Sequence, residues 1–382
     1  MEFRDLKQQY GLYKKEIDCA IQQVLKKADF INGSQVKQLE EKLAEYVGVR
    51  NCITCANGTD ALQLALMAWN IGKGDAVFVP DFTFFSSGEV VSFAGAKPIF
   101  VDVREDTFNI DPKKLRKTVI KILEEGKYTP RVIIVVDLFG QPAEYMRIRE
   151  IADEFHLLVL EDGAQGFGGG IEDRKACSFG DISTTSFFPA KPFGCYGDGG
   201  AVFTDNDEWA ELIFSLRTHG KASCKYDNVR IGMNSRLDTL QAAILLAKFN
   251  VFKDYELDRV NEVSEMYTRG LHETVITPKV LSGYISSWAQ YTIKLAERDL
   301  RDRLQTFLKE SGIPSMVYYP KPMHMQEAFA PYTNDMCELR VTEQLCERVL
   351  SLPMHPYMET EDINQVVVLI NEYLSKHSNC SR

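Results

Sequence analysis

Residues 157–165 read Leu-Leu-Val-Leu-Glu-Asp-Gly-Ala-Gln, an apolar run that ends in two carboxylates and a glycine. A run that is apolar throughout is typical of a strand buried on both faces of a parallel sheet. Open α/β sheets bind ligands at the carboxyl ends of such strands, which is where Asp162 would lie. Taken alone, Asp162 would also fit a helix cap or a structural ion pair, so its role depends on the rest of the chain.

Similar runs recur on both sides of this strand. We expect strands at Leu157–Glu161 and at Asn51–Cys55, Ala76–Pro80, Pro98–Val101, Val132–Leu138 and Ala201–Thr204. Helical patterns lie before and between them, at Ser34–Val47, Asp60–Trp69, Ser86–Ala94, Pro112–Glu125 and Glu144–Phe155. This alternation predicts a layered α/β domain around a largely parallel sheet.

The pattern changes after residue 250. Apolar stripes predict helices around Leu300–Leu308 and Ile363–Leu374, and Ala289–Leu295 and Pro314–Tyr319 are expected as strands. We therefore expect two domains. Residues 1–249 would form an N-terminal arm and a large α/β domain, and residues 250–382 a smaller α+β domain.

The composition excludes several classes of protein. The chain has 382 residues, of which 45% are apolar and 26% charged, as in ordinary globular proteins. Its net charge of −10 disfavours nucleic-acid binding, which needs a concentrated basic face. No apolar run is long enough to span a membrane, and the polar start predicts a cytoplasmic location. The nine scattered cysteines indicate reduced thiols, and no metal site is expected.

The segment Ala56-Asn-Gly-Thr-Asp60 joins an expected strand to an expected helix. Backbone N–H groups at the start of a helix, together with the helix dipole, form a site for phosphate groups. Gly58 would permit a close approach and Thr59 would add a hydroxyl. The same residues also suit an ordinary turn with a helix cap, so the motif is weak by itself.

A single lysine, Lys191, lies in the segment 186–201, Ser-Phe-Phe-Pro-Ala-Lys-Pro-Phe-Gly-Cys-Tyr-Gly-Asp-Gly-Gly-Ala. Apolar surroundings destabilise the charged form of an amine and favour the neutral nucleophile. A lysine that binds an aldehyde, paired with an acid that keeps a pyridine nitrogen protonated, is the pattern of pyridoxal phosphate enzymes. Lys191 and Asp162 are the candidates for this pair.

Together these segments resemble the DegT/DnrJ/EryC1/StrS family of pyridoxal-phosphate-dependent sugar aminotransferases. The resemblance covers essentially the whole chain. It rests on the Asn-Gly-Thr-Asp-Ala loop, the Glu-Asp-x-Ala-Gln segment, the Ser-Phe-x-x-x-Lys segment and Asn-Ser-Arg-Leu at 234–237, in this order. It implies fold type I, with a large three-layer α/β/α domain and a smaller C-terminal α+β domain.

The resemblance also implies roles. Lys191 would bind the aldehyde of pyridoxal 5′-phosphate, Asp162 would pair with the ring nitrogen, and Gln165 would contact the ring hydroxyl. Phe84 would stack on the ring, and the less favoured alternative is a core aromatic. The phosphate would be held by Gly58, Thr59 and Ser186, and by Asn234 of the neighbouring subunit of a homodimer with shared active sites.

Substrate contacts are expected from Arg236, Tyr318, Tyr319 and His324, with Arg236 placed to bind a carboxylate by a bidentate fork. Relatives often have His-Tyr-Pro where this chain has Tyr318-Tyr319-Pro320, which leaves the sugar open. We also expect a local basic pocket made by Lys191, Arg217, Lys221, Arg230 and Arg236.

Within the family, residues 186–201, here called the lysine segment, and residues 234–246 are most similar to enzymes acting on UDP-2-acetamido-2-deoxy-3-oxo-glucuronate. The expected reaction moves the amino group of L-glutamate to the C3 ketone of such a nucleotide-linked sugar, for bacterial surface polysaccharides. One alternative is a 6-deoxy 3-keto or 4-keto dTDP-, GDP- or UDP-sugar as substrate. A remote alternative is a non-catalytic, cofactor-binding regulator. A nucleotide-dependent oxidoreductase is disfavoured because the first strand–helix turn lacks G-x-G-x-x-G.

Overall fold

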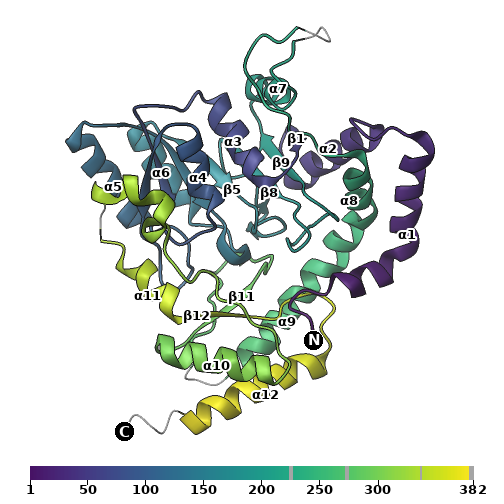
Figure 1. The fold of residues 1–382 in the computed structure, drawn as a ribbon, viewed down its shortest axis with the longest axis vertical. Helices are drawn as coiled ribbons and strands as arrows, with labels where there is room; N and C mark the ends of the chain where they lie inside the picture. The colour runs from purple at the N-terminus through teal and green to yellow at the C-terminus, as the bar shows by residue number, and fades with distance from the viewer. Residues whose placement is uncertain (223–226, 272–274, 336–337, 378–382) are drawn as a thin grey trace.

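The computed structural model describes residues 1–222, 227–271, 275–335 and 338–377. Its centre is a seven-stranded sheet (Figure 1). The strand order is β1 (Asn51–Cys55), β9 (Gly200–Thr204), β8 (Ile182–Ser186), β5 (Leu158–Asp162), β4 (Thr129–Val136), β2 (Asp75–Pro80) and β3 (Lys97–Val101). Strand β9 runs antiparallel to both of its neighbours, and the other pairings are parallel. The prediction of a largely parallel sheet is confirmed.

Helices cover both faces of this sheet. Alternate residues of β2 point to opposite sides, with Val77 and Val79 in one apolar cluster and Ala76 and Phe78 in another. The first cluster is completed by α3 (Gly58–Ala68), α4 (Ser86–Phe93) and α7 (Asp207–Leu216). The second is completed by α5 (Pro112–Glu125) and α6 (Tyr145–Phe155). The expected three-layer α/β/α architecture is therefore present.

The N-terminal segment is more regular than the expected arm. It forms α1 (Leu6–Lys27), which packs along α8 (Thr239–Val251), while α2 (Ser34–Val47) packs against α8 and β1. The apolar residues of α1 form only a weak stripe, and its buried residues are Ile17, Val24 and the polar Gln9. The weak apolar pattern explains why no helix is predicted there.

The C-terminal part has its own apolar cluster around Tyr267, Tyr291 and Leu304. Its helices are α9 (Leu257–Gly270), α10 (Arg298–Glu310), α11 (Arg340–Arg348) and α12 (Thr360–His377), and the π-helical turn η2 (Phe252–Glu256) precedes α9. Strands β11 (Tyr291–Lys294) and β12 (Val349–Leu352) form a two-stranded sheet. The predicted strand Pro314–Tyr319 is wrong, since only Met316 forms a bridge, to Ser351. Within the described ranges, no helix has the length and apolar character needed to cross a membrane.

Short elements complete the fold. Strands β6 (Gly170–Ile171), β7 (Arg174–Lys175) and β10 (Tyr284–Ile285) form a small sheet, which joins the large part to the segment before β11. The 3-10 turns are η1 (Leu138–Gly140), η3 (Met323–Met325) and η4 (Glu327–Asp335).

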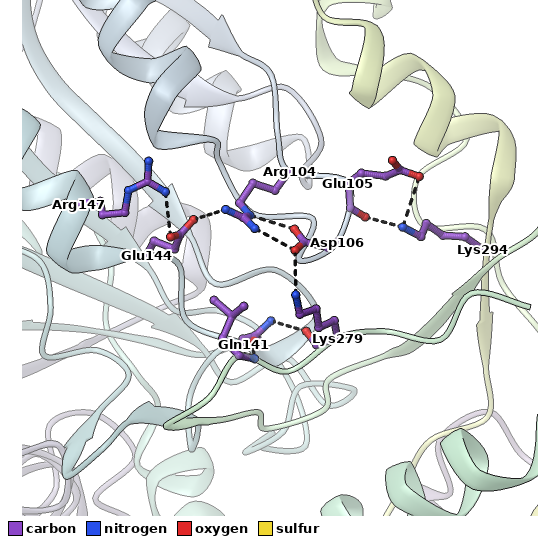
Figure 2. Close-up of polar contacts among 9 residues, drawn as sticks. Arg104, Glu105, Asp106, Gln141, Glu144, Arg147, Lys279 and Lys294 are labelled. Carbon is purple, nitrogen blue, oxygen red and sulfur yellow. Dashed lines mark hydrogen bonds and ion pairs between the residues drawn. The ribbon is translucent and has the colours of Figure 1, made fainter.

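Charged side chains join the C-terminal part to the loop after β3 (Figure 2). Arg104 forms a forked ion pair with Asp106, whose carboxylate also lies 3.6 Å from the amine of Lys279. The amine of Lys294 donates a 2.6 Å hydrogen bond to the carbonyl of Glu105. These contacts fix the C-terminal part against the edge of the sheet where the strands end.

Gly140 permits a close approach between the backbone of the large part and that of the C-terminal part. Gly140 has φ of +116°, and a Cβ atom there would lie 2.5 Å from the backbone nitrogen of Trp288. Its carbonyl accepts a hydrogen bond from the backbone of Ser287 at 3.0 Å. A side chain at this position would therefore push the C-terminal part away from the large part.

We expect Gly140→Ala to lower the free energy of unfolding by about 2–4 kcal/mol, because it combines backbone strain with a backbone clash. Gly126→Ala is the matched control. Gly126 also has a positive φ, of +63°, but a Cβ atom there would meet nothing within 4 Å. The control should cost about 1–2 kcal/mol. Equal losses in denaturant titrations of the two variants would contradict the proposed close contact.

Candidate active site

A cavity of about 760 Å³ lies where the central strands end and the C-terminal part begins. It is lined by residues from α3, α4, β5, β8, the lysine segment and the loop 317–326. Nine of the twelve predicted site residues line it: Gly58, Thr59, Phe84, Asp162, Gln165, Ser186, Lys191, Tyr318 and Tyr319. The fold thus gathers predicted site residues that are up to 261 positions apart in the chain, from Gly58 to Tyr319.

One end of the cavity has the features of a phosphate site. Helix α3 begins at Gly58, and its first N–H groups have no acceptor within the helix. The hydroxyls of Thr59 and Ser86, at the start of α4, are 2.7 Å apart. A Cβ atom on Gly58 would lie 2.8 Å from the Cβ of Ser186, so a larger residue would fill the space. Two helix starts and three hydroxyls therefore converge on one small cradle.

The carboxylate of Asp162 lies at the end of β5 and is buried. One oxygen accepts a 2.8 Å hydrogen bond from the hydroxyl of Ser87, and the other accepts a 3.2 Å bond from the backbone of Ala164. Burial raises the pKa of this carboxyl, while the Ser87 hydrogen bond and the positive charge of Lys191 oppose the shift. A cation placed against Asp162 would therefore be strongly stabilised.

Lys191 lines the same cavity, in the loop after β8. Burial lowers the pKa of its amine, and the charge of Asp162 opposes that shift. The amine is thus closer to its neutral, nucleophilic form than an exposed lysine would be.

Aromatic and amide groups form the walls between these features. The amide oxygen of Gln165 accepts a 2.7 Å hydrogen bond from the backbone of Phe139, and its nitrogen donates to the hydroxyl of Tyr319 at 3.1 Å. The ring of Phe84 lies 6.5 Å from that of Tyr319 and is 54% exposed, which excludes a role as a core aromatic. A flat aromatic ligand could pack against this face.

The structure does not bring the other three predicted residues to the cavity wall. Asn234 is exposed and forms a β-bridge with Thr218, and Arg236 lines a second cavity. His324 has its ring nitrogen Nδ1 2.7 Å from the buried carboxylate of Asp81. Burial alone would lower the pKa of His324, but Asp81 outweighs it and raises the pKa. In this single chain, His324 holds the loop 317–326 rather than facing the cavity.

The expected single basic pocket is wrong. Arg217 is buried against the carboxylate of Glu40 at 2.7 Å and against Thr54. Lys221, Arg230 and Arg236 line the second cavity, which also contains Glu208 and Glu211. Of the five predicted cations, Lys191 is the one that lines the cavity containing Asp162. Spacing along the chain could not reveal that Arg217 already has a buried partner.

Sequence reasoning missed three lining or supporting residues. Ser86 and Ser87 begin α4, where paired hydroxyls at a predicted helix start would have been a usable signal. Gln290, from the segment before β11, also lines the cavity. Its buried amide oxygen has no hydrogen-bond partner among the described residues, and no local motif marks it.

The lining fits pyridoxal 5′-phosphate. The cradle at Gly58, Thr59 and Ser186 suits its phosphate, and the buried carboxylate of Asp162 suits a protonated ring nitrogen. Lys191 supplies an amine for the aldehyde.

Comparison with known proteins agrees with this geometry. Residues 12–371 match the DegT/DnrJ/EryC1/StrS aminotransferase family. The UDP-2-acetamido-2-deoxy-3-oxo-D-glucuronate aminotransferase of Pseudomonas aeruginosa is 43% identical over 95% of this chain and 97% of its own length. A pleiotropic regulatory protein of Geobacillus stearothermophilus is 41% identical over 97% of each chain.

A solved structure gives the same result. A DegT DnrJ EryC1 StrS aminotransferase from Brucella abortus superposes with a TM-score of 0.95 at 44% identity, covering 98% of this chain and 99% of that chain. This similarity confirms the expected fold class. The chain therefore belongs to the DegT/DnrJ/EryC1/StrS aminotransferase family.

Proposed function

We propose that this aminotransferase moves the amino group of L-glutamate to the C3 ketone of a nucleotide-linked keto sugar, with UDP-2-acetamido-2-deoxy-3-oxo-glucuronate as the first candidate. The observation that carries the proposal is the pairing of Lys191 with the buried Asp162 in one cavity. The name of the Pseudomonas aeruginosa relative and the match of residues 234–246 to such enzymes support the choice of sugar.

The cofactor is pyridoxal 5′-phosphate, and when bound it supplies an electron-withdrawing ring that stabilises negative charge on a substrate carbon. Asp162 would hold the proton on the ring nitrogen, since its charge is stabilised by Ser87 and Ala164. The amine of Lys191 would take the proton from the substrate carbon and return it later. Its lowered pKa suits a base that works near neutral pH.

The other cavity residues would bind and orient. Gly58, Thr59 and Ser186 would hold the phosphate at the starts of α3 and α4. Gln165 would contact the ring hydroxyl and Phe84 would stack on the ring. Tyr318 and Tyr319 would line the sugar site, at the junction between a large domain, residues 1–249, and a small domain, residues 250–382.

We also propose a homodimer with shared sites. Asn234 is exposed and Arg236 lines a separate cavity, so neither reaches the cofactor cavity of its own chain. In a second copy, Asn234 could complete the phosphate cradle and Arg236 could bind the carboxylate of a uronic sugar or of glutamate. A cytoplasmic enzyme supplying surface polysaccharide synthesis, O-antigen included, fits these substrates.

Two alternatives to this function are a different sugar substrate and a regulatory role. A 6-deoxy 3-keto or 4-keto dTDP-, GDP- or UDP-sugar would use the same lysine and aspartate, so the site alone does not separate these substrates. The name of the Geobacillus stearothermophilus relative raises a regulatory role. A regulator needs the phosphate cradle, but it does not need a buried amine beside Asp162, and this favours the enzyme.

We expect Lys191→Ala to reduce turnover at least about 10²-fold while binding of pyridoxamine phosphate persists, because only the reactive amine is lost. Lys294→Ala is the control. It removes another buried lysine, which donates to the carbonyl of Glu105. It should retain most turnover, because Lys279 and Arg348 still pair with the same loop. Borohydride treatment and peptide mass spectrometry should locate the bound cofactor on Lys191 in the parent protein. Undiminished turnover by Lys191→Ala would exclude the proposed role.

The choice of sugar is tested with a panel of keto nucleotide sugars, L-glutamate and the purified protein, analysed by mass spectrometry. We expect an aminated product from the UDP-linked 3-oxo-glucuronate, and a loss of preference for the uronic sugar in Arg236→Gln. Amination only of 6-deoxy keto sugars would select the first alternative. If 2-oxoglutarate forms but no sugar in the panel is aminated, both the uronic sugar and the 6-deoxy sugars are rejected as substrates.

A further inference from the structure

The N-terminal segment contacts the backbone of the lysine segment. One guanidinium nitrogen of Arg4 donates to the carbonyls of Lys191, at 2.9 Å, and Pro192, at 3.2 Å. The neighbouring Phe3 is fixed on the other side, since its carbonyl accepts a hydrogen bond from the backbone of Met354. Its ring also meets that of Tyr318 edge-on at 6.2 Å. The start of the chain is thus packed between the lysine segment and the C-terminal part.

A second cation supports the same segment. The amine of Lys248, on α8, donates a 2.5 Å hydrogen bond to the carbonyl of Gly194. Burial lowers the pKa of Lys248 to about 8, while Glu256 opposes the shift and Arg4 adds to it. Arg4 and Lys248 therefore lie close enough to influence each other beneath the loop that carries Lys191.

One carboxylate faces these two cations. Glu256, in the π-helical turn η2, is buried and accepts hydrogen bonds from the side chains of Gln9 and Tyr357. The nearby His355 and three tyrosines are expected to be neutral at pH 7, while the carboxylates of Asp5 and Asp362 also act on His355. Burial lowers the pKa of His355 to about 4 and raises the pKa of Tyr357. Burial likewise raises the pKa of Tyr13 and Tyr196. Glu256 is the carboxylate that opposes the lowered pKa of Lys248 in this cluster.

We propose that Arg4 is a positioning residue for Lys191: it fixes the lysine segment through two backbone carbonyls and disfavours a proton on the lysine nitrogen through its buried charge. The inference rests on the proposed role of Lys191.

Two charged groups of opposite sign act on the amine of Lys191. After burial, Asp162 raises the pKa of the amine and Arg4 lowers it. The cavity lining also contains Asp198, Lys321, Tyr318 and Tyr319. Without Arg4, the carboxylate of Asp162 would be left to favour the protonated amine. Arg4 thus opposes the effect of Asp162 on the pKa of Lys191, while Asp162 stays available to the ring nitrogen of the cofactor.

A spectroscopic titration of the full-length protein with bound pyridoxal 5′-phosphate tests this. The visible absorbance of lysine-bound cofactor changes with the proton on the Lys191 nitrogen, so its pH midpoint reports that proton directly. We expect Arg4→Gln to raise the midpoint by about one pH unit and Arg4→Lys to leave it nearly unchanged. Glu256→Gln should shift it in the opposite direction, because a buried negative charge near Arg4 and Lys248 is lost.

Arg301→Gln is the matched control. Arg301 is also buried and donates to two backbone carbonyls, those of Cys346 and Val349, but these lie outside the lysine segment. Its loss should lower the melting temperature without moving the midpoint.

An unmoved midpoint in Arg4→Gln, or an equal shift in Arg4→Lys, would overturn the inference. If Arg4→Gln does not fold, an upward or absent shift in Glu256→Gln overturns it instead. A parent protein with no absorbance of lysine-bound cofactor would overturn the proposed function and the inference together.

Discussion

The active site depends on a carboxylate that burial largely removes from water. Asp162 is the last residue of β5, with Ser87 and the backbone of Ala164 as its hydrogen-bond donors. Such a group is costly unless hydrogen bonds or a nearby basic group compensate its charge, and Lys191 is the basic group that lines the same cavity. The rest of the fold surrounds this pair: the sheet places the acid, β8 leads into the lysine segment, and the C-terminal part closes the cavity.

Rigid support for the cavity comes from segments distant in sequence. Gly140 lets the backbone at Trp288 approach the large part, and Lys294 joins the C-terminal part to the loop after β3. The side chain of Arg4, near the N-terminus, donates a hydrogen bond to the backbone carbonyl of Lys191 in the lysine segment. A site built in this way is sensitive to changes far from the reacting atoms, because each wall belongs to a different part of the chain.

Much of this arrangement could be predicted from local patterns. The apolar run before Asp162 and the strand–helix alternation are properties of short segments, and six of the seven strands of the central sheet follow from them. Strand β8 and the helices α1 and α7 are not predicted. Contacts between distant residues could not be read in this way. Ser87 lies 75 positions from Asp162 and Arg4 lies 187 from Lys191, and nothing near either residue marks its partner. The expected basic pocket is wrong for the same reason, because the buried ion pair between Arg217 and Glu40 joins residues far apart in the chain.

The most direct test of the account is the nitrogen-15 chemical shift of the cofactor ring nitrogen in the loaded protein. If Asp162 serves to hold a proton there, the parent protein should show a protonated ring nitrogen across neutral pH. Asp162→Asn, which keeps the shape but removes the charge, should show an unprotonated one. An unprotonated nitrogen in the parent protein, or a protonated one in Asp162→Asn, would contradict the central claim that the buried carboxylate defines the chemistry of this site.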